Sequence, residues 1–403
     1  MATTRAKSFY NQYDIRRYVD ENNFSVIMDT ANQKYNGAAW RKLANWDTPS
    51  DSRTWSQGHK TVPIMARASL LSTHGLKPMR NTSGWKFYTG STPKIGHGYT
   101  MGEDDMFLLR DARNNTGASM QELIYDSLLT NAQNILGGMH NELSHMCYEL
   151  ASTGEIHEQS VDGVKYDFTF DFDENQFQTV SPAWFTVSGG VVVANASATV
   201  IQDILDLQDL YTNTQNRDVN AWMFNKNTLN LVLDHPSVLK AFVKWKTAGI
   251  SDSISNYPAT RTEVAAFLHD RGVWPFLPVD FKSVHEEDGL PVEDEPAFAP
   301  QYMIAFNMLE KMFSIKNTNS IWKDRQAYGG IARNTMYSFV EQRIAVLSTW
   351  GENPIHNTVE FELYAGPVFR NLRNYGRVKL YDPTESSTSS VSSSSTASSS
   401  SHG

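Results

Sequence analysis

Residues 118–151 read ASMQELIYDSLLTNAQNILGGMHNELSHMCYELA, and apolar residues recur along this stretch at steps of three and four. Such spacing is typical of one face of an α-helix with 3.6 residues per turn. Ser119 and Glu122 have the spacing of a capping box, and Gly154 suits the end of the helix. At 1.5 Å per residue the helix would span roughly 50 Å. We therefore predict one long amphipathic helix, a rod more typical of a subunit that extends and tiles than of a compact enzyme.

Two features inside this predicted helix carry further hypotheses. Gly137 and Gly138 each cost about 1 kcal/mol relative to alanine, so they mark either a boundary between two helices or a bend in one long helix. His140, Glu142 and His145 lie close enough in sequence to raise the hypothesis of a metal site. The HExxH spacing is absent, however, and side chains five positions apart diverge around a helix. We interpret the three residues as part of a polar helix face and predict no metal site.

The composition is typical of a soluble folded protein: 403 residues, of which 40% are hydrophobic and 20% are charged. Cys147 is the only cysteine and lies on the apolar stripe, so we expect a buried thiol and no disulfide, which suits a reducing cytoplasm. The first residues lack the apolar stretch of a signal peptide. The most apolar run, residues 187–201, is too polar for a membrane span, so we expect no membrane partner.

The net charge of −9 is distributed unevenly along the chain. Residues 1–100 hold 14 Lys and Arg against 6 Asp and Glu, whereas residues 101–403 hold 21 against 38. A basic segment joined to an acidic body can bind nucleic acid or the acidic body of a neighbouring copy. Because no run of basic residues in the first 60 positions is longer than two, the pattern favours contacts with a neighbouring protein.

The first quarter of the chain divides into two patterns. Residues 1–60 are polar and aromatic with weak periodicity, which favours an arm that becomes ordered on a partner surface. Residues 61–105 predict a long hairpin with one strand over 62–70 and a second that includes 85–88. A lone two-stranded hairpin is marginally stable in water, so this one should pack on something else.

The rest of the chain predicts a mixture of helices and strands. A hairpin centred on Asp162 and Gly163 has an outgoing strand with the aromatic residues of 164–172 on one face. The other predicted elements are helices over 200–213, 236–246 and 264–270, strands over 221–225, 278–284 and 302–307, and an extended segment over 360–365. From Thr384 onward the chain is almost entirely Ser and Thr, which is typical of a solvated tail.

The sequence contains two acidic clusters, of which the larger could be taken for a calcium site. Residues 285–295 lack the register of a calcium loop and are interrupted by Pro291, so we interpret them as a solvated turn between strands. Glu103, Asp104 and Asp105 form a second charged turn. No phosphate-binding loop, nucleophile elbow or CxxC motif occurs. We expect no catalytic residues and no cofactor.

Four segments carry a family resemblance. They are HNELSHMCYELASTGEI (140–156), which leads into Asp162-Gly163; WMFNKNT (222–228), followed by DHPSVL (234–239); PVDFKSVHEEDG (278–289), followed by APQYMIA (299–305); and PVFRNL (367–372). In their order and spacing these segments resemble the major capsid proteins of tailed bacteriophages, within the lambda capsid-protein-E branch of the Hong Kong 97-type fold. The resemblance covers most of residues 60–382.

The resemblance implies an α+β fold with a long spine helix in a peripheral domain and a mixed α/β axial domain. The implied division is an N-terminal arm over 1–60, an extended hairpin (the E-loop) over 61–105, a peripheral domain over 106–197 and 351–382 with its spine helix at about 118–151, an axial domain over 198–350, and a Ser/Thr-rich tail over 383–403. The Ser/Thr-rich tail departs from the family pattern.

The function implied by the resemblance is that of a shell protein, with no enzymatic activity. Copies would assemble as hexamers and pentamers into the icosahedral head of a phage virion, in the cytoplasm of a bacterial host. Separate scaffolding and portal proteins and a decoration protein are the expected partners, and packaged double-stranded DNA would be contacted non-specifically if at all. Two alternatives stay open: an encapsulin-like cargo compartment, and an aromatic-rich carbohydrate-binding or hydrolytic protein.

On this interpretation the arm and the hairpin supply the contacts between subunits, because neither can be stable alone. We expect the subunit to remain folded but to assemble poorly when residues 1–60 are removed. Gly137 and Gly138 would mark the bend of the spine helix. The expected contact residues are Arg5, Arg16, Arg17, Arg41, Lys42, Lys77, Arg80, Trp85, Lys86, Phe87 and Tyr88.

Overall fold

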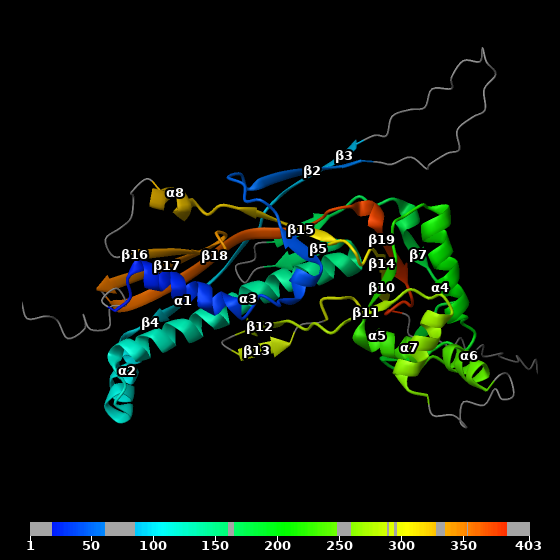
Figure 1. The fold of residues 1–403 in the computed structure, drawn as a ribbon, viewed down its shortest axis with the longest axis horizontal. Helices are drawn as coiled ribbons and strands as arrows, with labels where there is room; N and C mark the ends of the chain where they lie inside the picture. Colours follow the sequence, from blue (N-terminus) through cyan, green and yellow to red (C-terminus); the bar gives the residue numbers. More distant parts are fainter. Residues whose placement is uncertain are drawn as a thin grey trace, which may run out of the picture.

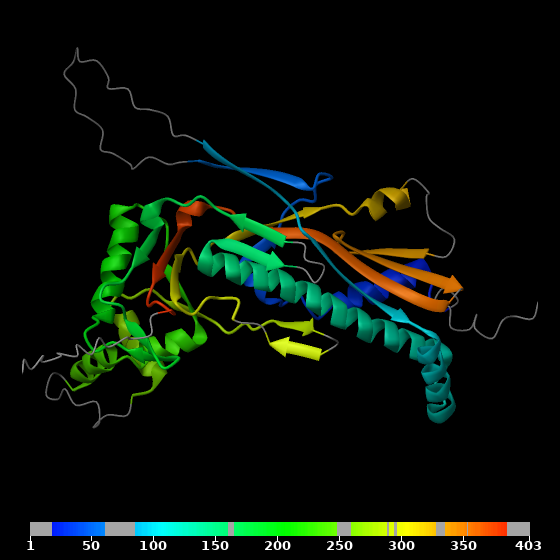
Figure 2. The same cartoon turned by 180° about the vertical axis from the view of Figure 1, so that it is seen from behind.

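A computed structural model describes residues 18–60, 85–159, 165–247, 259–287, 290–293, 296–327, 335–352 and 354–384. The chain forms an elongated α+β body, in which one long helix runs along a large sheet and a group of shorter helices lies at one end (Figures 1 and 2). Among the described residues, none of the helices combines the length and the apolar character needed to cross a membrane.

The long helix is α3 (Met120–Thr153), and its 34 residues confirm the prediction. Its ends follow the expected chemistry. Ser119 Oγ accepts a hydrogen bond from the Glu122 backbone N–H at 3.2 Å, and Glu122 Oε2 accepts one from the Ser119 N–H at 2.9 Å. Gly154 ends the helix at a φ of +81°, in the left-handed region that glycine adopts readily. The apolar stripe, including Cys147, is buried.

Helix α3 runs along a six-stranded sheet (Figure 2), and its buried stripe packs on this sheet. The central strand β18 pairs with β17 over residues 355–362 and with β15 over residues 364–369. It pairs with β4 over residues 357–364, on the edge opposite β17. These pairings join residues far apart in sequence. The strands of this sheet are β1 (Ala44–Trp46), β4 (Lys94–Met101), β15 (Phe313–Thr318), β16 (Thr335–Val340), β17 (Ile344–Glu352) and β18 (Ile355–Phe369). Helix α8 (Ile321–Ala327) lies on the opposite face, where Trp322 packs against Tyr337.

A second sheet of five strands divides two hydrophobic cores. All five residues of β10 are buried, and they alternate between the cores: Ala221 and Met223 contribute to the α3 core, and Trp222 and Phe224 to the second core. The strand order is β11 (Phe276–Val279), β10 (Ala221–Asn225), β14 (Tyr302–Phe306), β19 (Tyr375–Lys379) and β7 (Phe177–Thr179). The helices associated with the second core are α4 (Val200–Asp209), α5 (Lys226–Leu233), α6 (Pro236–Lys246) and α7 (Arg261–Asp270), with a π-helical turn over Leu210–Thr214 after α4. The two cores are therefore not independent, because each is built on one face of the same sheet.

Four two-stranded hairpins extend from these layers. The β5–β6 hairpin confirms the predicted aromatic face, because Tyr166, Phe168, Phe170 and Phe172 are buried or half-buried while Asp167 and the other alternate side chains of the described part are exposed. The predicted Asp162-Gly163 turn lies outside the described residues. The hairpins are β2 (Thr54–Lys60) with β3 (Trp85–Ser91), β5 (Glu155–Gln159) with β6 (Lys165–Thr169), β8 (Phe185–Ser188) with β9 (Val191–Ala194), and β12 (Val284–Glu287) with β13 (Leu290–Glu293).

Several expectations need correction. The strand predicted over 278–284 is replaced by the ends of two strands, β11 and β12. The stretch interpreted as a solvated turn contributes to a β-hairpin, in which residues 284–287 pair with residues 290–293. Glu103, Asp104 and Asp105 are not a turn but the first turn of helix α2 (Glu103–Thr116). Carboxylates are favourable there because a helix N-terminus carries partial positive charge, and Asp105 accepts the Gly102 N–H at 2.9 Å.

The segment expected to be ordered on a partner instead packs on its own subunit from Tyr18 onward. Helix α1 (Glu21–Gln33) and the short 3₁₀ helix over Ala39–Lys42 bury Phe24, Met28 and Trp40 against α3. The amphipathic pattern of α1 spans only 13 residues, which is short enough to be obscured by the polar residues around it. Removing residues 1–60 would take these side chains out of the core, so the expectation that the rest remains folded is revised.

Gly137 and Gly138 lie within one continuous helix, so the interpretation as a boundary between two helices is wrong. A Cβ placed on Gly137 would lie 2.6 Å from the Tyr35 hydroxyl oxygen, whereas one on Gly138 would meet nothing within 4 Å. The Tyr35 hydroxyl donates a hydrogen bond to the Gln133 carbonyl at 2.6 Å, which holds the ring in place. Gly137 thus allows the close approach of the segment that follows α1.

The expectation that His140 lies on a polar helix face is wrong. The residue is 1% exposed and lies beneath Trp40. Its Nδ1 accepts the Trp40 indole N–H at 3.1 Å, and its Nε2 lies 2.9 Å from Asn32 Oδ1. Burial, together with the nearby charge of Arg41, lowers the pKa of His140 to about 4. The histidine is therefore a neutral core residue that joins α3 to α1. Nowhere in the described ranges do three His, Cys, Asp or Glu residues gather so as to hold a metal ion.

The two glycines provide a matched pair of substitutions. We expect Gly137→Ala to lower the free energy of unfolding by about 1–3 kcal/mol, because the added methyl group displaces Tyr35. Gly138→Ala should raise it by up to about 1 kcal/mol, because alanine is the better helix former and has room. Equilibrium denaturant unfolding measures both, and equal effects of the two substitutions would contradict the assigned role of Gly137.

The buried neutral His140 predicts a pH dependence of stability. Its pKa is about 4 in the folded chain and near 6.5 when unfolded, so between these values the unfolded state binds the additional proton. Stability should therefore fall as the pH is lowered from 6.5 to 4, by roughly 3 kcal/mol for this group. His140→Gln should lose this dependence in unfolding measurements across that range.

His157 serves as the control for His140. Hydrogen bonds to Glu155 and Asp167 raise the pKa of this exposed histidine, so its contribution is present at low pH and is lost as the pH rises through its folded pKa. His157→Gln should therefore leave the acid-side loss of the parent intact. The same pH dependence in the parent and in His140→Gln would show that another group titrates.

Candidate assembly surfaces

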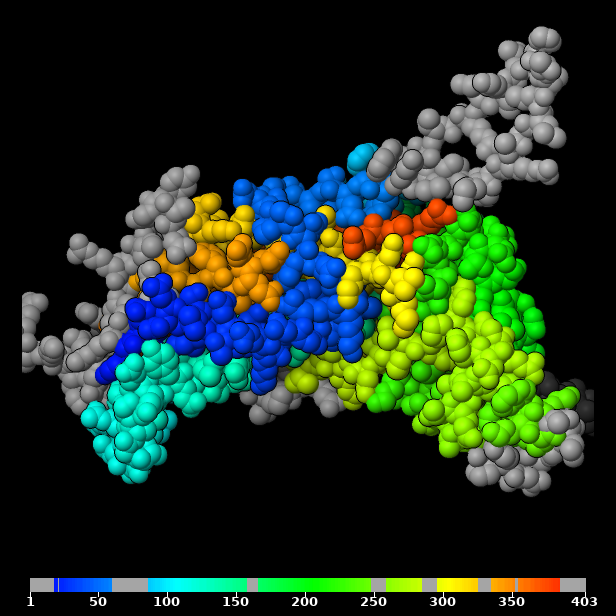
Figure 3. All heavy atoms as spheres, viewed as in Figure 1, coloured from blue at the N-terminus to red at the C-terminus, as the bar shows by residue number. Residues whose placement is uncertain are grey.

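The β2–β3 hairpin lies along one long edge of the body (Figures 1 and 3). The pairing runs from Thr54 opposite Ser91 to Lys60 opposite Trp85, so the incoming strand starts before the predicted residue 61. The predicted strand over 62–70 lies outside the described residues. At the base, Thr92 N–H donates to the Arg53 carbonyl at 2.9 Å, and the hydroxyl groups of Thr92 and Thr318 are 2.8 Å apart. The hairpin is thereby joined directly to the large sheet.

Aromatic contacts attach the hairpin to the β5–β6 hairpin. The ring centroids of Trp55 and Phe168 are 5.2 Å apart, and those of Tyr88 and Phe170 are 5.7 Å apart. Gly90 permits this approach, because a Cβ there would lie 2.6 Å from the Trp55 ring. Two hairpins that would each be marginal alone therefore cover one another.

Polar contacts at the same place involve two of the predicted contact residues. Lys86 Nζ lies 3.3 Å from Asp171 Oδ2 and 3.7 Å from Asp173 Oδ1, and the Tyr88 hydroxyl donates to the Asp171 carbonyl at 2.9 Å. The hydrogen bond to Asp171 raises the pKa of Lys86, and burial raises that of Tyr88. Both side chains therefore make contacts within their own subunit, and the exposed ion pairs add little stability.

Phe87 differs from its two neighbours on β3, because 69% of its side chain is exposed. Alternation along the strand turns Phe87 away from the face that holds Tyr88. A large apolar side chain in this position is typical of an interaction surface when it stands on a sheet edge. Of the expected contact residues with described side chains, Phe87 is the one that best fits a surface for another molecule.

Arg41 belongs to a network that fixes the segment after α1. Its guanidinium lies 2.5 Å from Glu341 Oε1, and the same carboxylate accepts the Trp46 indole N–H at 2.6 Å and the Asn32 amide at 2.7 Å. Burial favours a higher pKa for Glu341, but Arg41 and these hydrogen bonds outweigh it and lower that pKa. The carboxylate is therefore charged at neutral pH, and it joins the N-terminal segment to the large sheet.

Glu341 occupies a strained position. It has a φ of +50°, and Gln342 follows with a φ of +61°, in the three-residue connection between β16 and β17. A residue other than glycine costs of order 1–3 kcal/mol in such a conformation. The four-residue network supplies a reason for keeping the carboxylate in this place.

The other expected contact residues are placed as follows. Lys42 is exposed, and its carbonyl accepts Lys311 Nζ at 3.0 Å. The backbone of Trp85 is in β3, and its side chain is outside the description. Arg5, Arg16, Arg17, Lys77 and Arg80 lie outside the described residues.

Sequence reasoning missed a rigid apolar turn between β14 and β15. Leu309 is 87% exposed beside Met308, although the turn is held firmly: Met308 N–H donates to Asn220 Oδ1 at 2.8 Å and Leu309 N–H to Asn307 Oδ1 at 2.9 Å. The available signal was a Met-Leu pair between two strand patterns. Other exposed large apolar residues are Val26, Leu108, Val191, Val193, Trp245, Val284 and Ile321.

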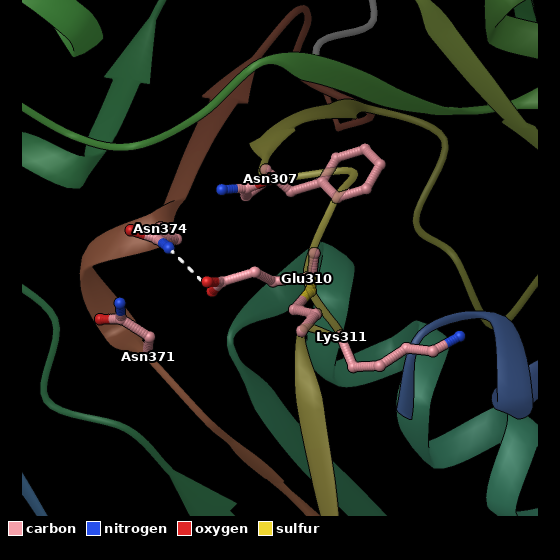
Figure 4. Close-up of a pocket in the computed structure, with 7 residues that line it drawn as sticks. Asn307, Glu310, Lys311, Asn371 and Asn374 are labelled. Atoms are coloured by element: carbon pink, nitrogen blue, oxygen red, sulfur yellow. Dashed lines mark hydrogen bonds between the residues drawn. The ribbon is translucent and has the colours of Figure 1, made fainter. Parts of the chain in front are cut away.

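A small cavity lies under this turn (Figure 4). Asn307, Glu310, Lys311, Asn371 and Asn374 surround it, and the Asn374 amide donates to Glu310 Oε2 at 3.4 Å. Its volume of about 10 Å³ is that of a single water site. The cavity is too small for a substrate or a cofactor.

Comparison with known proteins found likenesses among solved structures. A prophage protein of Escherichia coli CFT073 described as a capsid protein has a TM-score of 0.46 and 9% identity, over 90% of this chain and 99% of that one. A phage-related protein of Bordetella bronchiseptica RB50 has a TM-score of 0.44 and 10% identity, over 88% and 96%. The capsid of cyanophage A-1(L) has a TM-score of 0.43 and 13% identity, over 84% and 91%.

No family model matches the chain, and no curated protein matches it. All three TM-scores lie below 0.5. The three solved structures are described as phage capsid or phage-related proteins.

Proposed function

We propose that this chain is the major capsid protein of a tailed bacteriophage and that its copies form the icosahedral head shell around double-stranded DNA. The observation that supports this proposal best is the β2–β3 hairpin. It pairs with no further strand among the described residues, and it carries Phe87 on its exposed face. An open ribbon edge can add a strand to a neighbour, and an exposed apolar side chain can be buried there.

The body is suited to repeated lateral contacts. Its length is set by α3, and exposed apolar residues lie at separate places, on the β2–β3 hairpin, on α2 and on the Met308–Leu309 turn. Separate surfaces allow each copy to contact several neighbours through different patches. Heterologous contacts of this kind close into rings and shells when the rotation between copies closes, as in the hexamers and pentamers expected here.

The division into domains is proposed with shifted boundaries. Residues 313–350 were expected in the axial domain, but β15 and β17 pair with β18 and β16 pairs with β17 in the large sheet. We therefore propose that this part of the chain belongs to the peripheral domain. We place the axial domain at about residues 180–307, around the second core. We limit the proposed arm to about residues 1–17, and we start the proposed E-loop at Thr54, the first residue of β2, instead of at residue 61.

The shell role comes with a virion location, assembly in the host cytoplasm, and separate scaffolding, portal and decoration proteins. We propose no enzymatic activity. Every observation that supports the phage capsid also supports the encapsulin-like compartment. The two differ in what the shell encloses, which is DNA in the first and a cargo protein in the second. A carbohydrate-binding or hydrolytic protein would need carboxylates about 5–9.5 Å apart across a cleft. The small cavity of Figure 4 is not such a cleft, and the two carboxylates that line the larger groove beside α1, Glu122 and Asp126, are both on α3 and do not face each other across it.

Electron microscopy of the purified protein tests the proposal directly. We expect uniform closed shells, or rings of five and six subunits, because the exposed apolar patches are buried only when copies associate. Nucleic acid inside shells from infected cells would separate a phage head from a cargo compartment. A protein that stays monomeric at all concentrations would contradict both.

The ribbon surface is tested by Phe87→Ser. We expect the rate of assembly, measured by light scattering, to fall at least tenfold. The free energy of unfolding should change by less than about 0.5 kcal/mol, as is usual at surface positions. Thr89→Ser is the matched control, since Thr89 is exposed on the same face of β3. If both variants assemble at the parent rate, the exposed face of β3 is not an assembly surface.

A further inference from the structure

A groove lies between α1 and the N-terminal half of α3, which run side by side on the face seen in Figure 3. Its volume is about 430 Å³, within the range of about 300–1,000 Å³ typical of ligand pockets. Val26 and Ile27 of α1 and Tyr125 and Leu129 of α3 form its apolar wall, and Val26 is 62% exposed. We propose that the first 17 residues of the chain dock in this groove of the same subunit.

The described chain begins beside the groove. The hydroxyl of Tyr125, which lines it, donates to the Tyr18 carbonyl at 3.4 Å, and the next residue, Val19, is fully buried. The described part of the chain therefore starts at the groove. Five extended residues span at most about 17 Å, so Tyr13 can reach the groove wall from Tyr18 without any change in α1.

The composition of the segment matches the groove. Residues 1–17 read MATTRAKSFYNQYDIRR, with four basic residues, one acidic residue, three aromatic rings and an isoleucine. The groove adds the carboxylates of Glu122 and Asp126 to its apolar wall. Hydrogen bonds from Ser119 lower the pKa of Glu122, so it is charged at neutral pH. Arg16 and Arg17 come directly before Tyr18. The apolar and aromatic residues that precede them within reach of the apolar wall are Phe9, Tyr10, Tyr13 and Ile15.

Because residues 1–17 are covalently attached beside the groove, docking of the subunit's own segment is favoured over docking of a neighbour's segment. A short flexible tether gives an effective concentration in the millimolar range, whereas free subunits in dilute solution are orders of magnitude below it. This inference concerns the isolated subunit, and it does not depend on the proposed shell. A free subunit would in this way cover an apolar surface with its own N-terminus.

The experiment is disulfide trapping in the full-length chain at a concentration at which it is monomeric. The test variant carries Tyr13→Cys and Thr30→Cys, the latter at the groove. The control carries Tyr13→Cys and Asn134→Cys; position 134 is exposed on α3 but rotated by about 140° from Leu129. The native Cys147 is fully buried and its thiol pKa is raised, so it does not compete.

We expect the test pair to form an intrachain disulfide at least ten times faster than the control pair, at a rate independent of protein concentration. Adding Asp126→Lys should slow the reaction severalfold, whereas Asp111→Lys on α2 should not. Unchanged unfolding curves for the reduced variants confirm the fold. Equal rates for the two pairs would overturn docking in the groove, and disulfides only between chains would assign the groove to a neighbouring copy and overturn the proposal as stated.

Discussion

The burial of the α3 stripe is the contact on which the other parts of the subunit depend. The helix is covered by the large sheet along one side and by α1 and Trp40 along another, and these elements come from the two ends of the sequence. Neither cover is independent: β1 follows directly on the segment that packs on α3, and it pairs with β15 of the sheet. A rod of this length is stable because packing on an amphipathic face, more than helix propensity, stabilises helices in proteins.

The second core is coupled to the α3 core through the five-stranded sheet. Since alternate residues of β10 and β14 enter different cores, a shift of one residue in either strand would exchange the side chains of both. The register is therefore specified from both sides. Rigid coupling of this kind suits a subunit whose contacts at one end must be positioned relative to those at the other.

The surfaces available for association differ in how they are held. The β2–β3 ribbon stands on aromatic contacts with β5–β6 and on Thr92 at its base, and the Met308–Leu309 turn is fixed by asparagine side chains. In both, polar groups bond within the subunit while an apolar side chain faces solvent. Arg41 and Lys86, which are expected as contacts on sequence grounds, also form ion pairs within the subunit.

The sequence alone determined the elements whose pattern is local. The period of the α3 stripe, its capping box, the aromatic alternation of β6 and the short helices after residue 198 follow from neighbouring residues, and the structure has them close to where they were predicted. The α+β class follows from these elements. Two of the misjudged features depend on residues far apart in the chain. His140 reads as polar until Trp40 and Asn32 satisfy it, and Arg41 reads as free until the strained turn at Glu341 brings a carboxylate to it. Only the tertiary structure decided which polar groups are buried and which apolar ones are exposed, because burial depends on the partners that folding supplies.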